Sequence, residues 1–254
     1  MIRRSALAGA LLIGLVGCAG ESDGDSDAPA TDARPPAADM APAADAGDPP
    51  ADIGPSDAAP PEAHPALTDP GLANDPAPET YAVYVETTAG VFYIDVTRAW
   101  SPHGADRFYN LVRIGFLDDV AFFRVIAGFV AQGGLHGDPL VAAHWQGAPI
   151  PSDPVRESNL RGTVSFATIG GDPASRRTQF FINYADNSRL DGLGFSPFGQ
   201  VRDMTAVDGL YSGYGDGPPQ GQGPDQARLR GEGNAYLRAG FPELDYVIEA
   251  RIVD

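Results

Sequence analysis

A change in composition near residue 78 is what most limits the folds open to this chain. Residues 19–78 consist largely of Ala, Pro, Asp and Gly, with almost no aliphatic or aromatic side chain that could form a core. Such a segment cannot bury enough apolar surface to offset the entropy lost on ordering. We therefore expect a disordered linker over 19–78 and one folded domain over 79–254, a length that suffices for a domain with its own core.

The first eighteen residues have the features of an export signal. Arg3 and Arg4 precede an apolar run, 6–16, that is too short to cross a bilayer as a stop-transfer helix. Leu15-Val-Gly-Cys18 resembles the lipobox of bacterial lipoproteins. The resemblance implies that 1–18 is a lipoprotein signal peptide and that Cys18 carries the lipid. The exported protein would then be held at the periplasmic or outer-membrane face of the cell envelope by its lipid anchor alone.

An ordinary export signal with an incidental cysteine is the alternative. Cys18 is the only cysteine of the chain, so an exported form has no intramolecular disulfide to offer. This favours lipidation of Cys18 over a structural role.

The charge distribution argues against a nucleic-acid partner. Residues 19–79 carry 14 acidic side chains and a single basic one, Arg34, while residues 80–254 carry 20 acidic and 14 basic side chains. Phosphates require clustered positive charge, which a net negative domain without a basic run does not supply.

Hydrophobic periodicity predicts a mainly β domain. Residues 81–87 and 91–96 alternate around a turn and predict a hairpin, and Ser101-Pro102 predicts the start of a helix that ends before Gly115. Further strands are expected at 120–132, 162–168, 178–183, 197–202 and 246–253, with further helices after Asp203 and over 225–238. Many short strands with two or three helices suit a closed antiparallel barrel.

One charged residue interrupts the most apolar of these strands. Arg124 lies in Phe122-Phe-Arg-Val-Ile-Ala-Gly-Phe-Val-Ala-Gln-Gly-Gly134, among aromatic and β-branched residues. Removing a guanidinium from water costs several kcal/mol unless something pairs with it. Arg124 either lies at a sheet edge with its head in water or serves a function.

Three motifs in order favour a function. The stretch around Arg124 is followed by Ser165-Phe-Ala167 and then by Gln179-Phe-Phe-Ile182. Together they resemble the cyclophilin family of peptidyl-prolyl cis/trans isomerases, over about residues 80–254. The resemblance implies a closed eight-stranded antiparallel barrel capped by helices, and it implies no cofactor and no metal.

The resemblance also implies a set of site residues. Arg124 would donate a hydrogen bond to the prolyl nitrogen, and Gln132 would orient Arg124 and the substrate carbonyl. The pocket for the proline ring would comprise Phe129, Val130, Phe181, Leu190 and Phe195. The groove for the peptide before the proline would comprise Ala167, Thr168, Ile169 and Gln179. Alternation along 179–183 agrees in part, because Gln179, Phe181 and Asn183 share one face while Phe180 and Ile182 point into the barrel.

Some positions depart from the family pattern. Arg189 stands where a tryptophan is common in the family, and Thr168 replaces a frequent asparagine. These changes put cyclosporin binding in doubt more than turnover. The insertion 135–157 and the Gly-rich loop 211–223 are expected to shape access to the groove.

Three functional hypotheses follow. The first is a monomeric, lipid-anchored prolyl isomerase that acts on Pro-containing unfolded or extended segments of extracytoplasmic proteins. The second is a module of the same fold that binds such segments without turnover, and the third is a surface scaffolding lipoprotein. The combination of Arg124, Gln132, Phe129 and Phe181 favours the enzyme, because binding alone would not require an arginine donor.

Overall fold

The computed structural model describes residues 63–253. The expected signal peptide, Cys18 and the expected linker up to residue 62 lie outside the described residues. Within 63–253, no helix is both long and apolar enough to cross a membrane.

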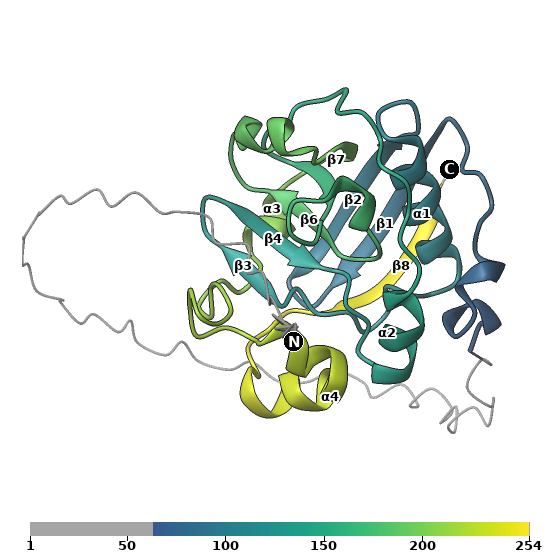
Figure 1. Ribbon diagram of the computed structural model, residues 1–254. Helices are drawn as coiled ribbons and strands as arrows, with labels where there is room; N and C mark the ends of the chain where they lie inside the picture. The colour runs from purple at the N-terminus through teal and green to yellow at the C-terminus, as the bar shows by residue number, and fades with distance from the viewer. Residues whose placement is uncertain (1–62, 254) are drawn as a thin grey trace, which may run out of the picture. The chain divides into compact units, whose positions relative to one another are not determined.

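Eight antiparallel strands form one sheet, which confirms the predicted strand number. Their order is β3-β4-β6-β5-β7-β2-β1-β8. The strands are β1 Thr80–Thr87, β2 Gly90–Thr97, β3 Arg124–Ile126, β4 Val130–Gly133, β5 Thr163–Phe166, β6 Phe180–Asn183, β7 Pro197–Val201 and β8 Val247–Val253. The α-helices are α1 Pro102–Arg113, α2 Pro139–Gln146, α3 Thr205–Asp208 and α4 Gln226–Gly240. Figure 1 shows α1 beside β8, and α4 next to α2.

The expected closure of the barrel is not confirmed. In the described part of the chain no ladder joins the terminal strands β3 and β8, so the sheet is an open half-barrel. The gap is crossed just before these strands, where Ala121 and Tyr246 form an isolated bridge. The Phe122 N–H also donates to the Asp245 carbonyl oxygen at 2.9 Å.

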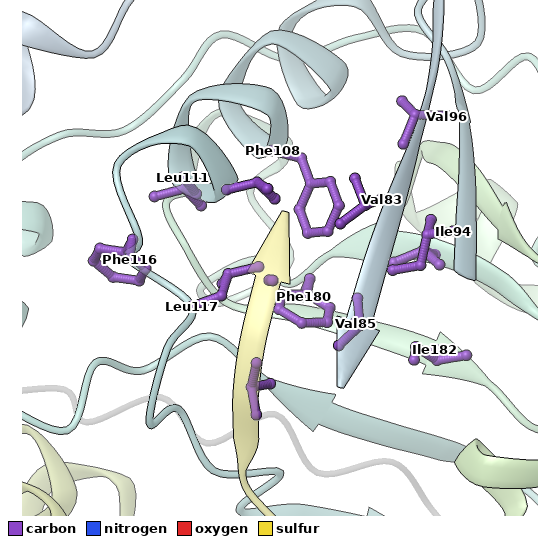
Figure 2. Packing of buried hydrophobic residues seen from close by; sticks show 14 of the residues in the cluster. Val83, Val85, Ile94, Val96, Phe108, Leu111, Phe116, Leu117, Phe180 and Ile182 are labelled. Atoms are coloured by element: carbon purple, nitrogen blue, oxygen red, sulfur yellow. The ribbon is translucent and has the colours of Figure 1, made fainter. Parts of the chain in front are cut away.

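The core lies between the inner face of the sheet and α1. Phe108 of α1 and Phe180 of β6 pack edge to face, with ring centroids 5.6 Å apart. Figure 2 shows these two side chains pointing into the same space as Val83, Val85 and Ile182. A smaller cluster, made of Ala121, Phe123 and apolar residues of α4 and its flanks, lies outside this core.

The single strand expected over 120–132 is wrong. Two strands, β3 and β4, form a hairpin there, and the turn between them places Gly128 at φ +70°. Phe129 closes the turn by donating its N–H to the Ile126 carbonyl oxygen at 2.9 Å. A glycine adopts this left-handed conformation without steric cost, so it breaks an otherwise continuous apolar run.

The start of α1 lies where it was predicted, but Ser101 does not cap it. The Ser101 hydroxyl donates instead to Asp153 at 2.6 Å. Asp153 accepts the N–H groups of His103 and Gly104 at 3.2 and 3.0 Å, so a carboxylate distant in sequence caps this helix.

The helix predicted from 225 continues to Gly240 and is interrupted at Gly233. Gly233 has φ +63° and ψ −153°, and a Cβ there would lie 2.1 Å from the Gly137 carbonyl oxygen. Close approach of the segment before α2 therefore requires a glycine. α2 itself lies within 135–157 and was not predicted.

The domain begins earlier than the expected boundary at residue 79. Residues 65–67 and 70–72 form short 3-10 helices, and Ala66 is fully buried in the main core. The Trp145 indole N–H donates to the Leu67 carbonyl oxygen at 3.0 Å. Residues 63–78 carry few apolar side chains, but their backbone groups find partners on α1 and α2, which composition does not reveal.

Candidate active site

Four of the predicted site residues, Arg124, Val130, Gln132 and Phe181, lie on the outer face of β3, β4 and β6. Arg124 is opposite Gln132, and Gln132 is opposite Phe181. Their strand neighbours Val125, Ala131 and Ile182 lie in the main core, as alternation requires. The three strands thus place a cation, an amide and an aromatic ring in one row.

A chain of hydrogen bonds connects the polar members of this face. Arg124 Nη1 donates to Gln132 Oε1 at 3.1 Å. Gln132 Nε2 donates to Gln179 Oε1 at 2.9 Å. The Gln132 amide therefore forms a hydrogen bond at both its oxygen and its nitrogen. Because the side chain is also buried, these two bonds fix its orientation.

Beside this chain lies an apolar cluster that is separate from the main core. Its buried members are Val130, Phe181, Leu190 and Phe195, with Phe129 and Ala167 packed at its edge. The rings of Phe181 and Phe195 meet edge to face at 5.6 Å. The structure therefore brings together all five residues assigned to the proline pocket.

The segment that carries Leu190 and Phe195 is held against the sheet by polar contacts. Leu190 lies on the 3-10 helix Ser188–Leu193, after which Gly194 adopts φ +82°. Asn159 donates to the Phe195 carbonyl oxygen at 2.9 Å and to Asp191 Oδ1 at 2.7 Å. These bonds hold the segment in place without using its apolar side chains.

Phe129 lies between two arginines. The Arg124 guanidinium carbon is 5.8 Å from the ring centroid, and that of Arg189 is 4.8 Å from it. Arg189 thus contacts the edge of the apolar cluster by a cation–π interaction.

The groove residues differ in their exposure. The Ala167 N–H donates to the Gln179 carbonyl oxygen at 2.8 Å, which joins the two segments of the groove. Thr168 is buried and its hydroxyl has no hydrogen-bond partner, whereas Ile169 is 50% exposed. No contact places Ile169 with the pocket cluster.

Sequence reasoning missed Asp216. Its carboxylate accepts hydrogen bonds from Arg124 Nε at 2.7 Å and from Nη2 at 2.9 Å. Partial burial acts to raise the pKa of Asp216, but the bonds and charge of Arg124 outweigh it and hold that pKa below its ordinary value. The need of Arg124 for a partner was the only available signal, and it did not identify which acid supplies it.

No group of three or more His, Cys, Asp or Glu residues that could hold a metal ion is present within 63–253. The face described above carries the Arg124–Asp216 pair, the Gln132 and Gln179 amides and the apolar cluster.

The fold defines the class of the protein. A cyclophilin-type peptidyl-prolyl cis-trans isomerase from Cryptosporidium parvum aligns with a TM-score of 0.51 at 20% identity, over 69% of this chain and 98% of that one. The same protein was also solved in the presence of the dipeptide Ala-Pro, and that structure aligns with a TM-score of 0.50 at 19% identity, over 68% and 99% of the two chains. The domain thus has the cyclophilin fold.

Sequence comparison identifies the family. The family model "Cyclophilin type peptidyl-prolyl cis-trans isomerase/CLD" matches residues 82–220. The chain is 32% identical to a peptidyl-prolyl cis-trans isomerase of Streptomyces antibioticus, over 53% of this chain and 87% of the relative. It is 35% identical to peptidyl-prolyl cis-trans isomerase A of Dickeya dadantii over 47% of this chain, and it spans 64% of that relative. The chain belongs to the cyclophilin-type peptidyl-prolyl cis-trans isomerase family.

Proposed function

We propose that this chain catalyses cis/trans isomerisation of X-Pro peptide bonds at the outer face of β3, β4 and β6. One observation carries the proposal: the Arg124–Gln132–Gln179 hydrogen-bond chain lies directly beside the apolar cluster of Val130, Phe181, Leu190 and Phe195.

The chemistry needs no nucleophile, base or metal. Rotation about an X-Pro bond is opposed by a barrier of about 18–20 kcal/mol, because the nitrogen lone pair is conjugated with the carbonyl. Twisting breaks this conjugation and makes the nitrogen a better hydrogen-bond acceptor. A donor aimed at that nitrogen and a pocket that grips the ring stabilise the twisted state more than the planar one.

Each part of the face has a role in this scheme. Arg124 donates to the prolyl nitrogen, and Gln132, held at both ends, orients Arg124 and the substrate carbonyl. Phe129, Val130, Phe181, Leu190 and Phe195 hold the proline ring. Ala167, Thr168, Ile169 and Gln179 bind the peptide before the proline, where the exposed side chain of Ile169 is available to it.

Pro-containing segments of unfolded or extended proteins are the proposed substrates. The structure of the Cryptosporidium relative in the presence of Ala-Pro supports this substrate class. A monomer suffices, because every proposed site residue comes from one chain.

We place this activity outside the cytoplasm, where the protein would assist folding of exported proteins from a lipid anchor at Cys18. Support comes from Arg3, Arg4, the apolar run 6–16 and the lipobox-like Leu15–Cys18. We expect Cys18→Ala to move the protein from the membrane to the soluble fraction of its cells. Membrane association equal to that of the wild type would exclude the anchor.

The activity is tested by exchange NMR on a short Ala-Pro peptide with the full chain at substoichiometric concentration. We expect cis/trans exchange to be far faster than the uncatalysed isomerisation, which takes tens to hundreds of seconds. A matched Ala-Ala peptide should bind more weakly, because it lacks the ring that fills the pocket.

A module that binds without turnover is favoured by one observation, the carboxylate already paired with Arg124. Peptide binding with exchange left at the uncatalysed rate would select that alternative.

A further inference from the structure

The Gly-rich loop 211–223 extends the outer face by one position beyond the edge strand β3. Gly215 forms an antiparallel bridge with Val125. In an antiparallel register, residue 216 is then opposite residue 124. Asp216, Arg124, Gln132 and Phe181 therefore follow one another across the face. Figure 1 shows the yellow-green loop next to β3.

Asp216 binds one edge of the Arg124 guanidinium. Its two oxygens accept from Nε at 2.7 Å and from Nη2 at 2.9 Å, a bidentate arrangement. Gln132 accepts one Nη1 hydrogen at 3.1 Å. A guanidinium has five N–H donors, so one hydrogen on Nη1 and one on Nη2 are not used by these bonds.

The side from which Asp216 reaches Arg124 shows whether its carboxylate supports the guanidinium or fills the place of the substrate. Asp216 reaches Arg124 from beyond the edge strand, whereas Gln132 and the pocket residue Phe181 lie on the other side of it. The carboxylate is thus placed behind the guanidinium relative to the proline pocket, and a ring bound among Val130, Phe181 and Leu190 would not have to displace it.

The loop holds this carboxylate through contacts that do not involve Arg124. The Tyr214 ring packs on Tyr211 and on Phe241, at 5.0 and 5.1 Å. The backbone carbonyl oxygen of Asp216 accepts the Gly223 N–H, and the side-chain Oδ1 of Asp216 accepts the Gly217 N–H, both at 2.8 Å. Because the loop is anchored independently, Asp216 can restrain the arginine.

We propose that Asp216 is a positioning residue that, together with Gln132, holds the Arg124 guanidinium in the orientation needed for isomerisation. The inference rests on the proposed function, since it assigns Asp216 a part in the same site. Arg124 is only 17% exposed and Asp216 28%, so the pair is shielded from solvent more than an ordinary surface ion pair. Without the pair, a long side chain at a sheet edge would sample several rotamers, and displacement of a donor by about 1 Å can cost up to a hundredfold in rate.

The test compares Asp216→Ala and Asp216→Asn with the wild-type full chain in the Ala-Pro exchange experiment. We expect kcat to fall about tenfold in Asp216→Ala and less in Asp216→Asn, which keeps one acceptor oxygen, while peptide Kd changes by less than about twofold. Asp95→Asn is the matched control, because Asp95 also binds an arginine, Arg202, through both oxygens but on a different part of the surface. It should leave kcat unchanged.

A second readout follows the guanidinium itself. The Nε–H resonance of Arg124, assigned from its loss in Arg124→Lys, should shift and exchange faster with solvent in Asp216→Ala. A purely structural role of Asp216 would lower thermal stability but would not alter kcat at fixed Kd together with this resonance.

The outcomes separate the two proposals. A wild-type chain that accelerates exchange, with Asp216→Ala equally fast or faster, overturns the positioning role and leaves the proposed function intact. A wild-type chain that binds peptide without accelerating exchange overturns the proposed function itself.

Discussion

At the scale of single residues, a buried ion pair holds the segments beside the groove. Arg176 is 1% exposed and donates from Nη2 to Asp153 at 3.0 Å and to the Pro151 carbonyl oxygen. Its Nη1 donates to Ser101 Oγ at 3.2 Å. Asp153 in turn caps α1. One pair therefore connects the start of that helix to the residues just before β6.

We predict that Asp153→Asn destabilises the protein by about 3–5 kcal/mol, because it leaves the Arg176 charge buried without a counterion. Urea unfolding measures the change. Asp208→Asn, which breaks the exposed pair with Arg161, should cost at most about 1 kcal/mol. Equal effects of the two variants would contradict the assignment of Asp153 as a buried structural anchor.

Protonation of the same carboxylate should lower the free energy of unfolding at acid pH. Burial acts to raise the pKa of Asp153, but hydrogen bonds from Ser101 and His103 and the charge of Arg176 keep it below its ordinary value. A depressed folded-state pKa stabilises the native state above about pH 4 and ceases to do so as pH falls through the folded-state value. Unfolding free energies measured from pH 6 to pH 2 should therefore fall less steeply in Asp153→Asn than in the wild type. Parallel curves would show that Asp153 does not contribute to this loss of stability.

At the scale of elements, the two faces of β6 lie in different apolar clusters. Phe180 packs on Phe108 and Phe122 in the main core, with ring centroids 5.6 and 6.2 Å away. Phe181 points the other way and packs on Phe195 in the proposed pocket. We therefore propose a structural role for Phe180 and a substrate-binding role for Phe181.

We predict opposite phenotypes for the matched changes Phe180→Leu and Phe181→Leu. The first should lower the free energy of unfolding by about 1 to 1.5 kcal/mol and leave kcat/KM of the folded protein unchanged. The second should lower kcat/KM about tenfold, because it removes ring contact from the pocket, with a smaller loss of stability. Thermal unfolding measures the stability of both variants, and Ala-Pro exchange measures their activity. If Phe180→Leu loses activity as strongly, the two faces are not functionally separate.

Local signals account for the elements that could be predicted. Alternation and a turn predicted the β1–β2 hairpin, and Gly115 was correctly placed just past the end of α1, where it adopts φ +71°. α2 was missed although Asp138-Pro139 is a start signal, and Asp138 does accept the Leu140 N–H at 2.8 Å. Its eight residues are too few for a clear helical period.

The residues themselves predicted the candidate site only on the strands, where alternation assigns each side chain to a face. The opposite faces of Phe180 and Phe181 follow from alternation, and the remaining pocket residues were named by family resemblance. Asp216 could not be predicted, because it lies 92 residues after Arg124 in a loop whose course depends on tertiary contacts of Tyr214.

At the scale of the whole molecule, the segment 63–78 belongs to the folded domain. Asn110 on α1 donates to the Asp75 carbonyl oxygen at 2.7 Å and accepts the Asp75 N–H at 3.2 Å. The Ala77 N–H donates to Asp106 at 2.8 Å. Composition predicted a linker here because these contacts use backbone groups rather than apolar side chains.

We predict that a chain starting at residue 79 is less stable than one starting at residue 63. Loss of Ala66 and Leu67 uncovers the Trp145 ring and removes the carbonyl oxygen that accepts its indole N–H, which then faces water. Tryptophan emission should shift to longer wavelength and the unfolding midpoint should fall, with Trp100→Phe used in both forms to isolate Trp145. Identical emission and identical midpoints in the two forms would show that residues 63–78 do not stabilise the folded domain.

We propose that Arg124 acts on the twisted peptide bond rather than on the bound ground state. One experiment addresses it: peptide Kd and exchange rate measured by NMR in the same samples for wild type and Arg124→Ala. Arg202→Ala is the matched control, because Arg202 also pairs with an aspartate and lies over an aromatic ring. We predict that Arg124→Ala slows catalysed exchange by about a hundredfold or more while Kd changes less than about threefold, and that Arg202→Ala changes neither. Exchange that stays fast in Arg124→Ala, or that falls only in proportion to lost binding, would show that Arg124 does not stabilise the twisted peptide bond.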